Sequence, residues 1–296
     1  MRNLKGSYER SGVFTKVVLL LVITLFFTLL LLPIIALLSY LHLAEVEMLK
    51  ISQLLLSIGV IVLPPFVLAY LIVLNPLTFL HLERNNINWL DVLFVVLFMI
   101  LIIPFINLLG DLNHHLVLPK VYAGLETLMK DSEEQAAQLT EKFLNVHTIQ
   151  GLFYNIFLIG VIPAIGEELY FRGALQGIIY QRNGIVKSIW ITAIIFSTIH
   201  FQFYGFLPRM LMGAFFGYLV FWSENILLPI VGHFTNNVIA VIFYHFKLNG
   251  HKLPDIDVIG FGNTLWIGLL SGVIALFGFL WLKSHFITQK GKIINT

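Results

Sequence analysis

The sequence of 296 residues contains no cysteine and few charged residues. Without cysteine the chain can form neither a disulfide nor a Cys-X-X-Cys redox pair, and any metal site must use histidine and carboxylate ligands. Asp, Glu, Lys and Arg make up 11% of the residues, whereas a soluble domain has about 25%. The net charge is +2, and no tract rich in lysine or arginine is present. We therefore expect no nucleic-acid partner.

Hydrophobic residues make up 58% of the chain and gather into long runs. A run of about 20 apolar residues is long enough to cross a bilayer as a helix. Such runs are found near residues 14–40, 52–80, 89–109, 151–181, 187–203, 206–222, 225–246 and 262–282. The sequence therefore predicts an all-α, polytopic transmembrane helix bundle of about eight spans in contact with membrane lipid.

The runs divide the chain into three regions. Residues 1–150 hold the first three expected spans and an acidic extramembrane segment, 110–150. Residues 151–247 hold the next four spans, and residues 248–296 hold the last span and a basic tail. The first run is too long for a signal peptide and lacks a cleavage site, so we expect it to be retained. The distribution of lysine and arginine predicts cytoplasmic termini for a protein of the cell membrane.

The acidic segment contains a helix-start pattern. Ser132 and Gln135 have the spacing of a capping box, which predicts a short amphipathic helix that begins there. Its apolar side would carry Leu139, Phe143 and Leu144. A surface helix at the membrane interface and a gating lid both fit this segment, and we favour the surface helix.

The fourth run carries three charges within six positions. Glu168 and Arg172 are four residues apart, so they can neutralise one another on one helix face. Glu167 has no local partner. Pro163 also leaves the carbonyl of Ile159 without its helical donor. Because a charge at mid-bilayer costs from about 3 to more than 10 kcal/mol, these side chains are functional candidates.

Polar residues that could meet Glu167 stand in two later runs. His200 ends the stretch FSTIH, and His233 and Asn237 begin and end HFTNN. His233 and Asn237 share a helix face, and His200 is as far from the expected turn near residue 184 as Glu168 is. Interhelical hydrogen bonding is the alternative for any one of these residues. A single hydrolytic site accounts for all of them together.

Three motifs resemble one protein family. EELYFR at residues 167–172 matches EExxxR, FSTIH at 196–200 matches FxxxH, and HFTNN at 233–237 matches HxxxN. In this order, within about 150–247, they are similar to the CAAX protease and bacteriocin-processing (CPBP, or Abi) family of intramembrane metalloproteases. The resemblance implies an intramembrane endopeptidase. Its substrates would be membrane-associated or lipidated proteins or peptides, of the CAAX type or with a leader to be removed.

The resemblance also assigns roles in the hydrolysis of a peptide bond. Glu167 would be the general base that activates water. Glu168 would be held by Arg172 as an orienting group, or would supply a metal ligand.

The remaining motif residues would act on the water and the substrate. His200 and His233 either polarise the water directly or bind Zn²⁺, with Glu168 as a third ligand. Asn237 would donate a hydrogen bond to the oxyanion. A glutamate-activated water without metal is the alternative. The candidate catalytic residues are Glu167, Glu168, Arg172, His200, His233 and Asn237.

Two other functions fit a buried cluster of Glu, His and Arg. One is a transporter or proton relay, although the sequence lacks the inverted repeats and paired interrupted helices of many transporters. The other is a non-catalytic scaffold, such as a bacteriocin-immunity protein, that carries the same residues without turnover. The sequence predicts no oligomeric state.

Two GxxxG pairs, at residues 173–177 and 213–217, favour close helix packing. Glycines at this spacing allow helix backbones to approach one another in lipid. We expect a packing role for both pairs.

Overall fold

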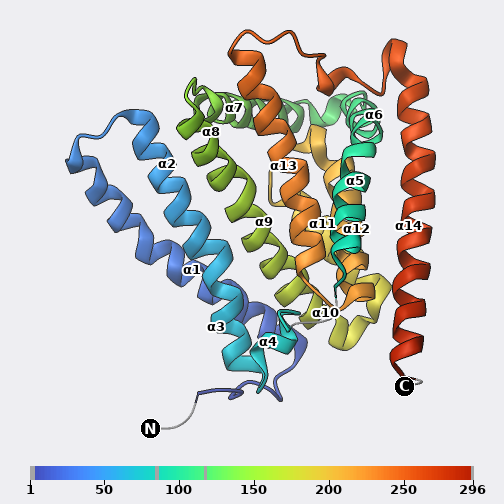
Figure 1. Ribbon diagram of the computed structural model, residues 1–296. Helices are drawn as coiled ribbons and strands as arrows, with labels where there is room; N and C mark the ends of the chain where they lie inside the picture. Colours follow the sequence, from blue (N-terminus) through green and yellow to red (C-terminus); the bar gives the residue numbers. More distant parts are fainter. Residues whose placement is uncertain (1–3, 84–86, 117–118, 295–296) are drawn as a thin grey trace.

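A computed structural model describes residues 4–83, 87–116 and 119–294 of the chain (Figure 1). Every regular element in these residues is a helix, with no β-strand among them. The predicted all-α, polytopic bundle is therefore confirmed. Residues 1–3, 84–86, 117–118 and 295–296 belong to the N-terminal, loop and C-terminal regions of the prediction and lie outside the described residues.

The first helices form an antiparallel pair on one side of the bundle (Figure 1). Helix α1 (Val13–Leu38) packs against α2 (Glu45–Leu56), η2 (Ser57–Val62) and α3 (Leu63–Ile72). The π-helical turn η2 precedes two prolines, Pro64 and Pro65, whose missing N–H groups interrupt the regular hydrogen-bond ladder. A four-residue helix, α4 (Pro76–Phe79), follows at the end of the bundle where α1 begins.

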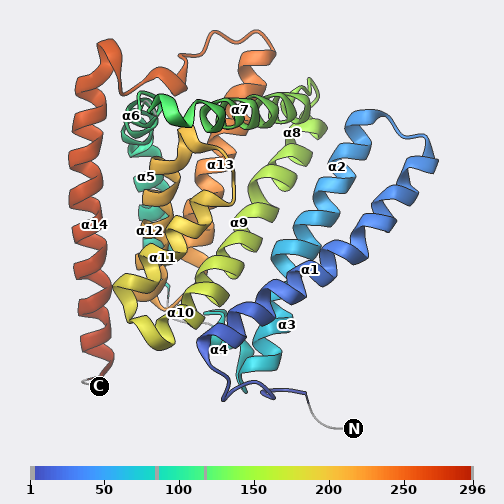
Figure 2. The same cartoon turned by 180° about the vertical axis from the view of Figure 1, so that it is seen from behind.

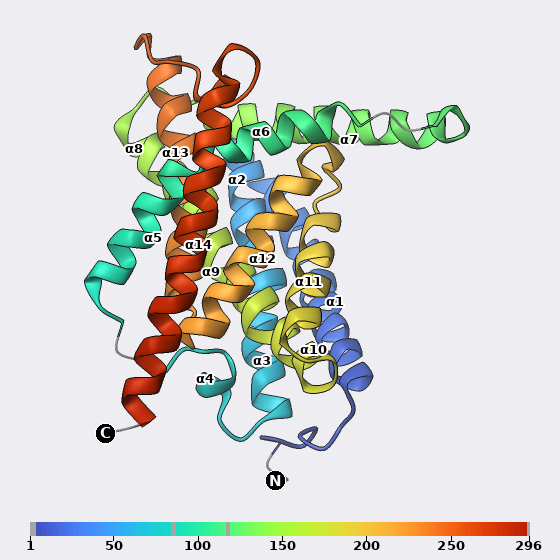
Figure 3. The ribbon, with the colours of Figure 1, turned by 90° about the vertical axis from the view of Figure 1, so that its right-hand side faces the viewer.

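The third expected span is a bent pair of helices. Helices α5 (Trp89–Leu101) and α6 (Ile103–His114) meet at an angle of 43°. Pro104 lies in the first turn of α6, where it cannot donate to the carbonyl of the preceding turn. The bend turns α6 across the end of the bundle and toward the extramembrane segment (Figure 3).

The extramembrane segment contains one long helix, α7 (Ala123–Leu144), after the short turn η3 (Lys120–Tyr122). Figure 3 shows α7 lying across one end of the bundle, nearly perpendicular to the long helices. The predicted start at Ser132 is wrong, because the helix begins nine residues earlier. The residues before Ser132 are mainly good helix formers, so the helix continues through the serine. Phe143 and Leu144 are buried as expected, whereas Leu139 is exposed.

A bent central helix carries the first motif (Figure 2). It consists of α8 (Ile149–Asn155), η4 (Ile156–Val161), α9 (Ile162–Glu167), η5 (Glu168–Leu175) and α10 (Gln176–Asn183). The segments η4 and η5 are π-helical, and such turns are frequent at functional sites. The motif EELYFR thus begins at the last residue of α9 and continues in a widened turn.

The remaining helices follow the central helix in the chain, and α11 and α13 pack directly against it. They are α11 (Ile185–Thr198), η6 (Phe203–Gly205), α12 (Phe206–Ser223), α13 (Leu227–Leu248), η7 (Ile256–Val258), η8 (Gly262–Thr264) and α14 (Leu265–Ile294). Helix α12 packs against α6, α11, α13 and α14, which places it near the middle of this half (Figure 3).

The number of candidate spans is roughly consistent with the about eight that the sequence predicts. Six described helices are long and apolar enough to cross a membrane, and the bent pair of α5 and α6 makes up to seven. The fifth expected span, near 187–203, is the apolar helix α11, which has 14 residues and is shorter than the other candidate spans. It ends at Thr198, before the second motif is complete. The start of α1 and the end of α14 lie at the same end of the bundle (Figure 1).

Apolar side chains both fill the bundle and cover its outside. One core cluster surrounds the central helix and includes Leu68, Ile72 and Phe171. Another joins α5, α12, α13 and α14 through residues such as Phe98 and Phe216. The outer faces of α1 and α14 expose large apolar residues, as expected for helices in contact with lipid. The charged side chains of the first motif, Glu167, Glu168 and Arg172, lie between the helices and not on these outer faces.

Candidate active site

Glu168 and Arg172 form an ion pair in the centre of the bundle. The side chain of Glu168 is 0% exposed and that of Arg172 is 1% exposed. Nη1 of Arg172 donates to Oε1 of Glu168 at 2.9 Å, and its Nη2 donates to the carbonyl of Gly213 at 3.2 Å. The guanidinium also lies 4.4 Å from the ring centre of Phe196. The pair therefore neutralises itself, as the spacing predicts, and α12 supplies a further acceptor.

His233 connects this pair to α13. Its Nδ1 lies 2.8 Å from Oε1 of Glu168. Because Glu168 is ion-paired with Arg172, its carboxylate acts as the acceptor and Nδ1 of His233 carries the proton. The ring also stacks on Phe216, with 5.8 Å between ring centroids. These contacts fix both the plane of the imidazole and the nitrogen, Nε2, that points away from Glu168.

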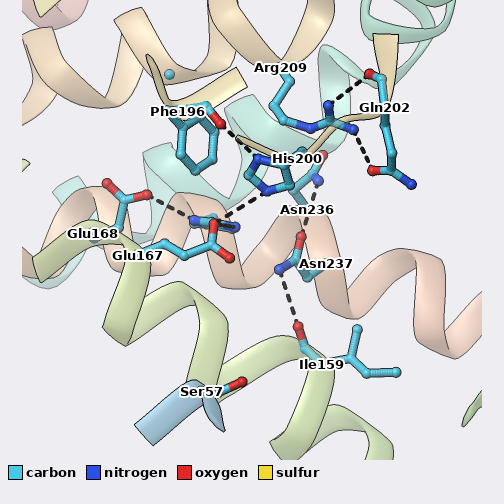
Figure 4. Close-up of polar contacts among 12 residues, drawn as sticks. Ser57, Ile159, Glu167, Glu168, Phe196, His200, Gln202, Arg209, Asn236 and Asn237 are labelled. Carbon is cyan, nitrogen blue, oxygen red and sulfur yellow. Dashed lines mark hydrogen bonds and ion pairs between the residues drawn. The ribbon is translucent and has the colours of Figure 1, made fainter. Parts of the chain in front are cut away.

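Glu167 lies on the other side of this imidazole. Its Oε2 is 3.8 Å from Nε2 of His233 and 3.9 Å from Nε2 of His200. Nδ1 of His200 is 2.7 Å from the carbonyl of Phe196, which can only accept, so this nitrogen also carries a proton (Figure 4). In the neutral rings, Nε2 is therefore the nitrogen with the lone pair, and both Nε2 atoms lie on the side of the Glu167 carboxylate. The glutamate that had no local partner in the sequence faces the two histidines.

A cavity of about 330 Å³ opens in front of these groups. Its lining includes polar residues from α9, α12, α13 and the turn after α11, namely Glu167, His200, Gln202, Arg209, His233, Asn236 and Asn237. The side chain of Glu167 is 18% exposed, whereas Glu168 is fully enclosed. The structure thus separates the two adjacent glutamates, with one facing the cavity and the other behind His233.

Asn237 lines the cavity and also stabilises the central helix. Its Nδ2 donates to the carbonyl of Ile159 at 3.2 Å (Figure 4). That carbonyl lies four residues before Pro163, which has no N–H to donate. Asn236 donates to Oδ1 of Asn237 at 3.4 Å. One N–H of Asn237 therefore holds the helix that carries Glu167, and the amide has a second N–H.

The glycines of the second GxxxG pair make room for the central helix. A Cβ at Gly213 would lie 3.1 Å from Nη2 of Arg172, and one at Gly217 would lie 2.6 Å from Oε1 of Gln176. The carbonyls of both glycines accept hydrogen bonds from these two side chains. The expected packing role is therefore combined with hydrogen bonding to the helix that bears the first motif.

The donor atoms around the cavity are suited in kind to a divalent metal ion. A ligating histidine usually donates its other ring N–H to a carboxylate or a carbonyl, as His233 and His200 do here. Glu167 supplies a carboxylate oxygen on the same side. Within the described parts of the chain, however, no group of three or more His, Cys, Asp or Glu is arranged to hold a metal ion. Glu168, the third predicted ligand, is engaged by Arg172 and His233 behind the cavity.

Sequence reasoning missed two polar residues in this cavity, Gln202 and Arg209. Arg209 lies in the first turn of α12 and donates from both terminal nitrogens to Gln202 (Figure 4). In the sequence, Arg209 looks like a charge in the short connection between two spans. A signal was present, because the apolar run 206–222 contains this arginine as its one charged residue.

A second polar cavity, of about 510 Å³, lies beside the first and shares Gln202 with it. It is bounded by α7, α13 and the loop at residues 253–257, and its carboxylates are Glu133, Glu141, Asp255 and Asp257. Asp255 pairs with Lys247 at 3.0 Å. Burial, followed by the charge of Asp255, raises the pKa of Asp257. We call this second cavity the outer cavity, and it is acidic because its four carboxylates outnumber its one lysine.

Comparison with known proteins supports the resemblance carried by the three motifs. Residues 149–239 match a family model described as Type II CAAX prenyl endopeptidase Rce1-like. The matched segment contains every candidate catalytic residue, from Glu167 to Asn237. The predicted resemblance to CAAX-type membrane proteases is therefore confirmed for this segment.

Two curated bacterial proteins are similar to part of the chain. YdiL of Bacillus subtilis strain 168, named as a membrane peptidase, is 28% identical over 103 residues, which are 35% of this chain and 41% of YdiL. The membrane-embedded CAAX protease MroQ of Staphylococcus aureus strain USA300 is 28% identical over 135 residues, 43% of this chain and 50% of MroQ. The match thus spans half or less of each relative. No solved structure matches the chain. Together with the apolar helices, these similarities indicate a multi-pass membrane protein that is similar to CAAX-type proteases over residues 149–239.

Proposed function

We propose that this chain is an intramembrane endopeptidase that hydrolyses peptide bonds of membrane-associated or lipidated substrates with a water activated by Glu167. One observation carries the proposal. The Glu167 carboxylate lies within 4 Å of Nε2 of both His200 and His233, and all three side chains line one cavity. A carboxylate with two fixed imidazoles is an arrangement suited to the activation of water.

The mechanism follows from the direction of these side chains. Glu167 accepts a proton from a water in the cavity and later returns it to the leaving amine. The Nε2 atoms of His200 and His233 orient that water, because each Nδ1 is already bonded to an acceptor. A divalent ion such as Zn²⁺, if held by His200, His233 and Glu167, would polarise the water and the scissile carbonyl. Asn237 lines the cavity and would donate its second N–H to the developing oxyanion.

Glu168 and Arg172 act through His233. The carboxylate accepts from Nδ1 of His233, and the guanidinium holds that carboxylate in position. The pair thereby fixes the tautomer of the neutral ring and keeps Nε2 of His233 directed at the cavity. We assign both residues as positioning residues.

The proposal of a lipidated substrate has support in a neighbouring apolar cavity of about 360 Å³. It lies among α5, α6, α11, α12 and α14. It shares Ile106, Pro208 and Met212 with the cavity that Glu167, His200 and His233 line, which we call the catalytic cavity. A peptide backbone would lose hydrogen bonds in such an apolar space, whereas a hydrocarbon chain would not. We further propose that the protein resides in the cell membrane with both termini cytoplasmic.

The test is peptidase activity of the purified protein in lipid nanodiscs, with fluorogenic lipidated and unlipidated peptides. We expect Glu167→Ala and His200→Ala to abolish cleavage, and Glu134→Ala on the exposed face of α7 to leave it unchanged. Each protein is assayed with and without a zinc chelator. Loss of activity on chelation, restored by Zn²⁺, would support a metal-assisted water, and indifference to the chelator would support a glutamate-activated water. Cleavage that survives Glu167→Ala would contradict the mechanism.

A further inference from the structure

Arg209 is a fixed cation in the catalytic cavity. Its Nη1 donates to the carbonyl of Gln202 at 3.1 Å, and its Nη2 donates to Oε1 of the same residue at 2.8 Å (Figure 4). A Cβ at Gly205 would lie 2.9 Å from Nη2, so the glycine leaves space for the guanidinium. The side chain is half-buried and lines the same cavity as Glu167 and the two histidines.

The charge of Arg209 is not bonded to a carboxylate. Among the residues that the structure describes, no Asp or Glu oxygen lies within 4.0 Å of its guanidinium. Glu133 and Glu167 act on it electrostatically from a longer distance. The other described cations that line polar cavities are paired, Lys247 with Asp255 and Arg172 with Glu168. A guanidinium has five N–H donors, so donors remain after the two bonds to Gln202.

We propose that Arg209 binds a carboxylate of the substrate and so determines which peptides the catalytic cavity accepts. This inference rests on the proposed function. The carboxylate can come from the C-terminus of the substrate or from an Asp or Glu side chain near the scissile bond. Arginine suits either source, because its planar donor fork matches the two oxygens of a carboxylate.

The surroundings of Arg209 favour an anionic substrate group at this position. The carbonyl and amide oxygen of Gln202 hold the guanidinium on one side, which leaves it oriented before a ligand arrives. The outer cavity beyond Gln202 carries four carboxylates and one lysine, Lys247, which is paired with Asp255, so its excess of acidic groups would repel a further carboxylate. A substrate carboxylate is therefore directed to Arg209 and away from the outer cavity. With a volume of about 330 Å³, the catalytic cavity suits a short peptide end.

The test is a binding measurement that needs no turnover. The Glu167→Gln protein in lipid nanodiscs is titrated with three fluorophore-labelled peptides of the same apolar sequence. The first has a free C-terminus, the second a C-terminal amide, and the third a C-terminal amide and one Asp. We expect at least one carboxylate peptide to bind about tenfold or more tightly than the neutral amide, as for a charge-assisted hydrogen bond. Whichever peptide gains affinity identifies the source of the carboxylate.

The variants assign the effect to Arg209. In Glu167→Gln/Arg209→Gln the ratio of affinities should fall to about one, whereas Glu167→Gln/Arg182→Gln, altered on the exposed face of α10, should keep it. Gln202→Ala in the same background removes one partner of the guanidinium and should lower the ratio only in part. Because Gln202→Ala keeps the charge of Arg209, it provides the test of Arg209 if thermal unfolding shows that Arg209→Gln does not fold.

The outcomes separate this inference from the proposed function. Equal affinity for all three peptides, a ratio that persists in Arg209→Gln, or no binding by any peptide would overturn the role of Arg209. Cleavage by the wild-type protein in the same nanodiscs would then still support the peptidase. A ratio that depends on Arg209, together with no cleavage of any peptide by the wild type, would support the binding role and contradict the peptidase.

Discussion

Nδ1 of His233 lies 2.8 Å from Oε1 of Glu168, and this contact determines which nitrogen of the imidazole faces the catalytic cavity. The same carboxylate oxygen accepts from Arg172 at 2.9 Å. A carboxylate so engaged behind the ring is poorly placed to reach the cavity in front of it. In the proposed mechanism Glu168 therefore orients His233, while its neighbour Glu167 faces the cavity.

The ion pair of Glu168 and Arg172 gives the first prediction. Glu168→Leu leaves a buried guanidinium without a counter-charge and should destabilise the protein by about 3–5 kcal/mol. Glu168→Leu/Arg172→Met removes both charges and should recover most of that stability, because an apolar pair can replace a buried ion pair. Catalytic activity should stay low in both variants, since Nδ1 of His233 has lost its acceptor. Chemical unfolding in detergent and peptide cleavage measure the two effects separately.

The control for this pair is Arg172→Met alone, which keeps the acceptor of His233. A double variant as unstable as Glu168→Leu would show that the two charges do not depend on one another. A double variant with wild-type cleavage would contradict the positioning role of Glu168.

The close approach of α12 to the central helix gives the second prediction. In Gly217→Ala the new Cβ would lie 2.6 Å from Oε1 of Gln176 and 3.0 Å from Cγ2 of Ile189. Gln176 cannot move away freely, because its Nε2 donates to the Gly217 carbonyl at 3.1 Å. We expect a loss of about 1–3 kcal/mol in the free energy of unfolding.

Gly110→Ala is the matched control. No atom lies within 4 Å of a Cβ at this position in α6, so alanine should stabilise the helix by about 0.5–1 kcal/mol. Both variants are compared by thermal unfolding in the same detergent. A Gly217→Ala protein at least as stable as the wild type would show that the contact with Gln176 relaxes without cost.

The apolar runs and the three motifs were enough to predict the bundle and the residues that meet in it. The spacing of the motifs predicts their heights in the bundle, because each residue of a helix adds a fixed rise of about 1.5 Å. Glu167, His200 and His233 accordingly meet at one level of neighbouring helices. The π-helical turns η4 and η5 could not be predicted in this way. They depend on how each helix relieves a missing or crowded hydrogen bond after packing.

Local signals also failed where neighbouring residues outweighed them. Ser132 has the spacing of a helix start, but the helix-forming residues before it extend α7. Arg209 resembles a boundary charge in the sequence, and only the fold shows that it points into the catalytic cavity. Neither the tautomer of His200 nor that of His233 can be inferred before their acceptors are known.

The contact between α2, α7 and α8 gives the third prediction. Nζ of Lys50 donates to Oδ1 of Asn155 at 2.8 Å, and Nδ2 of Asn155 donates to the carbonyl of Phe143 at 2.7 Å. Both side chains are buried. Asn155→Ala leaves the ammonium and the carbonyl without this partner, at a cost of about 1–3 kcal/mol for each group. We expect faster proteolytic cleavage of the 110–150 segment in this variant.

Lys50→Met is the informative comparison. It removes the buried charge together with its need for a partner, so it should destabilise less than Asn155→Ala. Limited proteolysis and thermal unfolding of the two purified proteins test the order. If Lys50→Met destabilises the protein as much as Asn155→Ala, the lysine itself carries the contact between these helices.

The two contacts available to Asn237 give the fourth prediction. Asn237→Ala removes the donor at 3.2 Å from the Ile159 carbonyl and should lower stability by about 1–2 kcal/mol. Pro163→Ala restores an N–H four residues after that carbonyl, so the double variant Pro163→Ala/Asn237→Ala should regain stability. Its kcat should nevertheless remain about 100-fold below that of Pro163→Ala, because in the proposed mechanism the second N–H of Asn237 binds the oxyanion. Full recovery of kcat in the double variant would instead show that Asn237 acts only by holding the helix that carries Glu167.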